Sequence, residues 1–352
     1  YEAALTLYDA SLAAYGYSQG CSWDTVVLAN EVLDNLGKKN HALTALYGQM
    51  PTPARAAAIE AGWREISNLL DYLRRKHQGN ETQLLFAAQF KACAENAIEW
   101  YVEKNDPKSK AMAWMFAEKS RSLDLLEAFR HATARNTVFF EDSLRSMSDA
   151  FLAEKNKWRG LYEEAKRDTA RAAYLLKILE TNRQEEQWLR VLERRDTSFF
   201  NAKYNNSIVD VKTVRALLQP KQALLEYFVG NRHIYLFVIR HDTFMVQKVP
   251  LDFPLNDWIE QLRHGIHGYH GIVEEFKKPD VLRRKCLDQY HEFAPKLYQK
   301  LVAPVQKWLP EQGKIVIVPD GPIGLVPFDA LLTAVPEDKS DFSSYPYLFR
   351  KH

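Results

Sequence analysis

A cysteine and a histidine that lie close together, Cys286 and His291, are the first residues that could do chemistry. A thiolate attacks a carbonyl carbon while an imidazole acts as base and then acid, provided that the two side chains reach hydrogen-bond distance. Five positions apart on a predicted helix, these two side chains point to different faces, and a nucleophilic thiol normally needs a strand end or a helix N-terminus. We therefore interpret Cys286 as a buried packing residue.

Three histidines, His264, His267 and His270, follow one another at spacings of three and offer imidazole nitrogens to a metal ion. On a helix the adjacent pairs lie close, but the first and third diverge, and no cysteine or carboxylate completes an evident site. We interpret them as a His-rich loop or helix end. The chain also lacks a phosphate-cradling glycine loop, so the sequence predicts no metal and no cofactor.

The segment Lys314 to Leu332, KIVIVPDGPIGLVPFDALL, joins an apolar strand to a turn made by Pro319, Asp320, Gly321 and Pro322. The turn lies at the carboxyl end of the strand, which is the edge where open α/β sheets usually place their chemistry. Asp and Gly are also common at strand ends for turn geometry alone. Twenty residues follow Leu332, so we expect a sheet that this chain does not complete.

Before Tyr204 the sequence has few helix breakers and is predicted to be helical. Small, large and small residues at Ala4, Tyr8 and Ser11 match the second helix of a tetratricopeptide repeat, where a small side chain lets the neighbouring helix approach. A weaker copy follows in Ala113, Ala117 and Ser120. Further helices are predicted at Thr25 to Gly37, Pro53 to Lys76 and Glu81 to Lys104. A repeat solenoid and an irregular α-bundle both fit, because the repeat period drifts.

From Thr137 to Phe199 the composition changes to long charged helices. A bend near Arg167 to Thr169 would give an antiparallel hairpin, and one continuous helix also fits the pattern.

The part after Asn205 alternates helices and strands. A short helix, Val211 to Leu218, precedes three strands, and the residues at Gly230-Asn231 and His241-Asp242 tolerate positive φ, which predicts an antiparallel meander. Helices at Asn256 to His267 and at Pro279 to Leu309, the latter broken near Pro295 or Pro304, then lead to a strand at Ile315 to Val318. The three meander strands are predicted at Ala223 to Val229, His233 to Ile239 and Phe244 to Val249.

These patterns predict a mainly α chain with a C-terminal three-layer α/β part. We expect a helical repeat domain over residues 1–135, a long helical hairpin over 136–203 and an α/β domain over 204–352. The net charge of +2 gives no nucleic-acid signal, and no apolar run is long enough to cross a membrane. Three widely spaced cysteines favour a reducing compartment, so the sequence predicts a cytoplasmic protein.

Four motifs occur in an order that carries a resemblance: AEKSRSLDLLEAFR at Ala117 to Arg130, ALLEYFVGNRHIYLFVI at Ala223 to Ile239, LYQKLVAPVQKWL at Leu297 to Leu309 and VPDGPIGLVPFDALL at Val318 to Leu332. Together they resemble the bacterial TPR-CHAT family, from about Ala54 onward. The CHAT domain of that family is similar to caspases and separase.

The resemblance implies a caspase-like cysteine peptidase with a His-Cys dyad, whose helical repeats bind a protein partner or regulator and whose substrate is a polypeptide. In that family both catalytic residues follow the VPFDALL segment, and the next strand is expected to begin near Tyr347-Leu348-Phe349. No residue of this chain matches either position, so we assign no catalytic residue and expect the fragment itself to be inactive. The alternative is a non-catalytic interaction scaffold with a pseudo-enzyme α/β domain.

Overall fold

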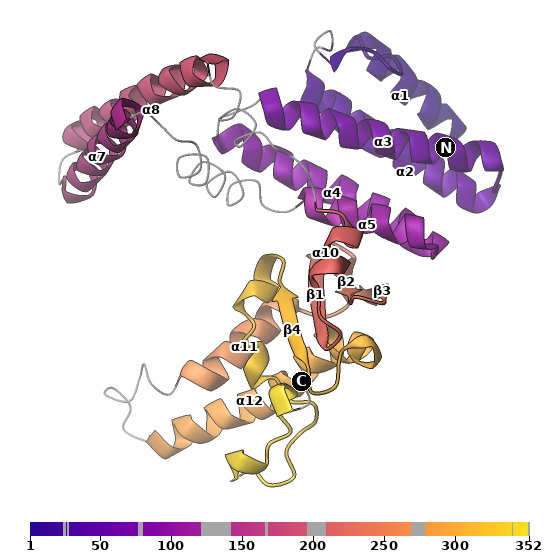
Figure 1. The fold of residues 1–352 in the computed structure, drawn as a ribbon, viewed down its shortest axis with the longest axis vertical. Coiled ribbons are helices and arrows are strands. Elements are labelled where there is room, and N and C mark those ends of the chain that lie inside the picture. Colours follow the sequence, from indigo (N-terminus) through magenta and orange to yellow (C-terminus); the bar gives the residue numbers. More distant parts are fainter. Residues whose placement is uncertain are drawn as a thin grey trace. The chain divides into compact units, whose positions relative to one another are not determined.

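The fold is mainly helical, with a small four-stranded sheet in its C-terminal part (Figure 1). The computed structural model describes residues 1–23, 26, 28–76, 80–120, 142–165, 168–195, 209–268, 279–339 and 341–350. The chain divides into two compact units: Tyr1–Leu73, Leu85–Arg121 and Ile208–His352 form one, and Arg74–Leu84 with Ser122–Ser207 form the other. The domain boundaries expected at 135/136 and 203/204 lie outside the described residues.

Five helices form the N-terminal part of the larger unit, and their ends follow familiar capping chemistry. Asp106 accepts N–H groups from Lys108 and Ser109, both at 3.0 Å, and Pro107 takes the first helical position, where a missing N–H costs nothing. The helices are α1 (Glu2–Ala14), α2 (Ala29–Gln49), α3 (Pro53–Lys76), α4 (Asn80–Lys104) and α5 (Pro107–Ser120).

The helix expected to end at Gly37 continues to Gln49, so that boundary was wrong. Gly37 is buried inside α2, where an added Cβ would collide with the sulfur of Cys93 on α4. The glycine therefore serves close helix packing rather than helix termination. Sequence alone does not separate these two uses.

The sheet has the order β3-β2-β1-β4, with β1 and β4 parallel and the other neighbours antiparallel. This confirms the predicted meander and the predicted return of the last strand by a helical crossover. None of Gly230, Asn231, His241 and Asp242 has a positive φ, however, so the predicted reason for the two turns was wrong. The strands are β1 (Gln222–Val229), β2 (His233–Ile239), β3 (Phe244–Pro250) and β4 (Lys314–Val318).

Both faces of the sheet are covered by helices of the larger unit. On one face, Leu225 and Leu236 pack with Leu297 in a core built by α11 (Leu255–His267) and α12 (Pro279–Leu301). On the other face, Phe228 and Phe237 belong to the core of the N-terminal helices. A central strand buried on both faces is apolar throughout, as HIYLFVI of β2 is. The short helix α10 (Val211–Leu217) precedes β1.

Of the two positions predicted for a break in the last long helix, Pro304 is confirmed. Pro295 lies inside α12 without ending it, and the break comes before the next helix, η2 (Ala303–Trp308), which has Pro304 in its first turn. Residues Leu348–Arg350 form a 3-10 turn instead of starting a strand, because the chain folds back and pairs Tyr347 with Leu332. The amide of Leu348 donates to the carbonyl of Leu331 at 2.9 Å.

The smaller unit contains a helical hairpin, α7 (Asp142–Glu164) and α8 (Asp168–Arg195). Lys155 and Glu185 pair across it at 2.6 Å, and the rings of Phe151 and Trp188 lie 5.8 Å apart. The predicted hairpin is therefore confirmed over the described residues. No helix in the described part of the chain has the length and apolarity that a bilayer crossing requires.

Gly265 offers a test of the packing between α11 and α12. A Cβ there would lie 2.8 Å from the backbone nitrogen of Tyr290, so Gly265→Ala must push two backbones apart. We expect a loss of about 1–3 kcal/mol of unfolding free energy. The matched change Gly48→Ala, in a helix with open space around the position, should be neutral or stabilising by up to about 1 kcal/mol. Urea unfolding measures both, and equal effects would contradict this packing.

Candidate functional site at the carboxyl edge of the sheet

The carboxyl ends of the two parallel strands define the candidate site. Because β1 and β4 run parallel, Val229 and Val318 end at the same edge of the sheet. The predicted turn follows at once, and Gly321 takes a φ of +52° at the start of a 3-10 helix. No atom lies near the place of its missing Cβ. This glycine is therefore required for its backbone conformation.

Asp320 connects three elements at this edge. Its Oδ2 accepts the N–H of Val229 at 2.7 Å, which fixes the end of β1. The same oxygen accepts a hydrogen bond from Nζ of Lys91, on α4, at 2.9 Å. The Asp320 side chain is only 16% exposed, so solvent screens this pair less than it would a surface pair. Asp320, which was predicted only to form a turn, therefore also attaches α4 to the sheet.

Glu95, one turn further along α4, binds the turn between β1 and β2. Its carboxylate accepts three consecutive backbone N–H groups, from Asn231 at 2.8 Å, Arg232 at 2.9 Å and His233 at 3.1 Å. Glu95 is 2% exposed, and a buried carboxylate is tolerated only when it is fully hydrogen-bonded. A Cβ on Gly230 would collide with this carboxylate, which explains the glycine.

A third buried contact joins α5 to the middle of β1. Nε1 of Trp114 donates to Oε2 of Glu226 at 2.8 Å, and both residues are almost completely buried. Glu226 lies on the same face of β1 as Phe228, which alternation along a strand requires. A carboxylate in the core therefore faces the helices and takes a donor from them.

A more exposed charge network extends these contacts to β3. Glu99 accepts hydrogen bonds from Arg232 at 2.7 Å and from Lys248. Burial opposes the ionisation of Glu99, but Lys248 and Arg232 together outweigh it and lower the pKa of this carboxyl. Burial, with the charge of Lys248, also lowers the pKa of His233.

Lys91, Glu95 and Glu99 thus form one row at spacings of four on α4, which we call the anchor row. Residues four apart lie on the same helix face. Each polar group of the row is used to hold the sheet edge, so the arrangement positions structure and does not form a nucleophile-base pair. This row was not predicted from the sequence; its signal was the spacing of Lys91, Glu95 and Glu99 at i, i+4 and i+8.

Cys286 and His291 are both buried residues of α12. Cys286 is 2% exposed in α12, as the packing interpretation predicted. His291 is 4% exposed, and its Nε2 lies 2.5 Å from the hydroxyl of Tyr345. Burial lowers the pKa of this imidazole and raises that of the Cys93 thiol to about 12. The Cys93 thiol therefore does not lie in a setting that stabilises a thiolate.

The three histidines His264, His267 and His270 do not form a metal site in the described part of the chain. Nδ1 of His264 lies 2.8 Å from Oε1 of Gln289 on α12, and His267 is the last residue of α11. His270 lies outside the described residues. Within the described ranges, no three His, Cys, Asp or Glu side chains are grouped in a way that could hold a metal ion.

Comparison with known proteins adds no assignment: no protein-family model matches the chain, and no curated protein sequence matches it significantly.

Replacing Glu95 tests the anchor row. Glu95→Gln keeps the size of the side chain but turns an amide NH₂ toward backbone donors, so we expect a loss of about 2–3 kcal/mol of unfolding free energy. Glu103→Gln, on the same helix, removes only a pair with Lys248 at 3.7 Å from a 64% exposed side chain, and should change it by less than about 0.5 kcal/mol. Urea unfolding of both variants makes the comparison. A Glu95→Gln protein as stable as the control would refute the anchoring role.

Thiol reactivity tests the packing interpretation of the cysteines. Cys21 is partly exposed, whereas Cys93 and Cys286 are buried. We expect a disulfide reagent to modify one thiol of the native protein quickly and all three only in denaturant. Cys21→Ser should remove the fast phase. Fast native modification of Cys286, or peptide hydrolysis by this chain that Cys286→Ala abolishes, would show that the interpretation is wrong.

Proposed function

We propose that this chain is the sensor and framework part of a caspase-like cysteine peptidase of the TPR-CHAT type, with TPR-like repeats in its helical part. In this proposal the His-Cys dyad lies beyond His352 in a longer parent protein. The helices receive a protein partner or regulator, and the α/β part carries the peptidase site, whose substrate is a polypeptide.

The backbone groups along the outer edge of β4 support this proposal. The amide of Lys314 donates toward β1, and since backbone groups alternate along a strand, those of Ile315 and Ile317 point away from β1. A further strand beside β4 would pair with these backbone groups, as the proposed parent requires.

The attachment of α4 to the carboxyl edge of the sheet supports the proposal that the helices regulate the peptidase site. Lys91 binds Asp320, which holds the end of β1 and lies in the loop after β4, and Glu95 binds the turn after β1. A partner that displaces α4 must break these hydrogen bonds or move the edge with it. Binding of a partner to the helices would therefore act directly on the edge of the sheet where the active site is proposed.

The test uses the full-length protein that contains this chain. The proposal predicts proteolysis of the protein itself or of a co-expressed partner, lost when the cysteine at the end of a following strand is changed to Ala. Absence of proteolysis under all tested partners, together with no such cysteine, would favour the scaffold alternative and overturn the proposal.

The link to the helices is tested in the same protein by Lys91→Met. We expect a change of about tenfold or more in partner-dependent cleavage, since a partly buried charged hydrogen bond contributes on the order of 1.5 kcal/mol or more. Lys38→Met removes a lysine paired within α2 with Asp34, far along the chain from the sheet, and should leave cleavage unchanged. Equal behaviour of the two variants would contradict the proposed link.

A further inference from the structure

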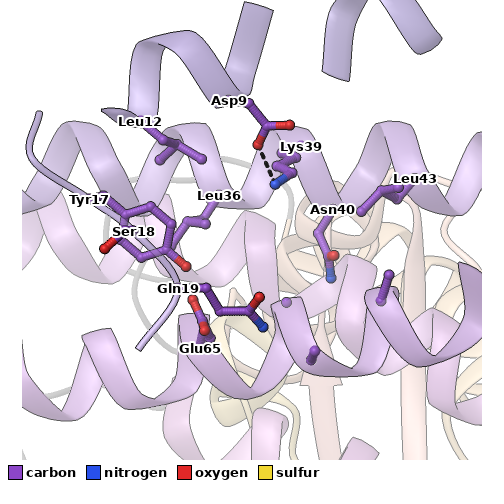
Figure 2. Close-up of a pocket in the computed structure, with 13 residues that line it drawn as sticks. Asp9, Leu12, Tyr17, Ser18, Gln19, Leu36, Lys39, Asn40, Leu43 and Glu65 are labelled. Carbon is purple, nitrogen blue, oxygen red and sulfur yellow. Dashed lines mark hydrogen bonds and ion pairs between the residues drawn. The ribbon is translucent and has the colours of Figure 1, made fainter. Parts of the chain in front are cut away.

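A pocket of about 370 Å³ lies among α1, α2, α3 and the segment after α1 (Figure 2). It is remote in sequence from the anchor row and from the sheet, and nothing in the proposed function uses it. Leu12, Leu36 and Leu43 supply apolar surface, while Asp9, Lys39 and Glu65 supply charge. The combination of apolar walls and a few polar groups is typical of small-ligand sites.

One wall of the pocket is set by backbone geometry. Helix α1 ends in a Schellman turn, in which Gly16 has a φ of +76° and donates to Ala13 while Tyr17 donates to Leu12, both at 3.0 Å. Gly20 again has a positive φ, +79°. The two glycines confine the segment between them and present Ser18 and Gln19 to the pocket.

Another wall is fixed by Asn40, which is 2% exposed. Its Nδ2 donates to the carbonyl of Ile59 at 3.0 Å and joins α2 to α3. Gly62, on α3, leaves the room that the Asn40 amide occupies, since a Cβ there would collide with its oxygen. A buried amide therefore lines the pocket at a position held from both helices.

The charges of the pocket do not balance. Asp9 and Lys39 form a pair at 2.5 Å and compensate each other. Figure 2 shows Glu65 apart from this pair, near Gln19. Glu65 is partly buried, and burial raises the pKa of its carboxyl against the opposing effect of a hydrogen bond from the Gly20 backbone. Among the described residues that line the pocket, no second cation offsets this carboxylate.

We propose that the pocket binds a primary alkylammonium group, with the ammonium beside Glu65 and the aliphatic part against the leucines. An ammonium ion donates up to three hydrogen bonds, for which the Glu65 carboxylate and the side-chain oxygens of Ser18 and Gln19 are suitable acceptors. The same chemistry occurs in a free diamine and in a lysine side chain of a peptide. Amine binding at this pocket does not depend on the proposed peptidase function, and its test contains no peptidase assay.

The test is calorimetric titration of the 352-residue chain with 1,5-diaminopentane and with Nα-acetyl-lysine methylamide, with 1-pentanol and pentanoate as comparison probes. A ligand of this size is expected to bind with a Kd of about 0.1–1 mM. Binding of the diamine alone identifies a small amine, and binding of the lysine derivative identifies a peptide ligand; either result supports the proposal. Equal binding of 1-pentanol, or no saturable binding of either amine, overturns it.

Two variants locate the binding. Glu65→Gln should weaken amine binding by about tenfold or more, because a neutral amide replaces the charged acceptor. Ala58→Phe, at an exposed position of the rim, should block the pocket without disturbing the core, so the test survives if Glu65→Gln fails to fold. Glu31→Gln, an exposed acid of α2 that does not line the pocket, is the control. Unchanged binding in the folded Glu65 or Ala58 variant contradicts the assignment.

Discussion

The burial of the Glu95 carboxylate is the constraint on which the arrangement of the larger unit depends. A charge removed from water must find its hydrogen-bond donors in the protein, and here three successive amides of the β1–β2 turn supply them. This requirement fixes α4 at one end of the sheet. It also brings the apolar core of the helices onto the strand face that carries Phe228 and Phe237. The helices therefore complete the sheet as its second covering layer.

The fold follows from the sequence wherever a local rule decides it. The bounds of α3 were predicted correctly, because Pro53 marks its first turn and a regular apolar stripe extends to Lys76. Three short β-rich runs separated by two-residue turns likewise predicted the meander, although the turn residues do not take the positive φ that was expected of them. A glycine gave an error: Gly37 lies inside a helix, because close packing against Cys93, which the sequence does not reveal, favours a glycine there.

The sequence predicted the position of the candidate site but not the residues that bind it, because those residues are distant in sequence. The strand-turn segment at Asp320 located the carboxyl edge, because turn chemistry is local. Its partners on α4 were not foreseen, since the hydrogen bond between Lys91 and Asp320 joins residues 229 positions apart. The spacing of the anchor row was visible, but charged residues at intervals of four are usually a solvated helix face. Only the packing of α4 on the sheet distinguishes an anchor from a surface pattern.

Because buried hydrogen bonds join α4 and α5 to β1 and to the turn after it, we expect the helical segment and the sheet to unfold as one cooperative structure. Native-state hydrogen exchange of the chain in increasing denaturant measures it most directly. Our account predicts that the slowest amides of α4, α5, β1 and β2 share one opening free energy and one denaturant dependence. The account would be contradicted if the amides of β1 and β2 stayed protected through an opening that exposes α4 and α5.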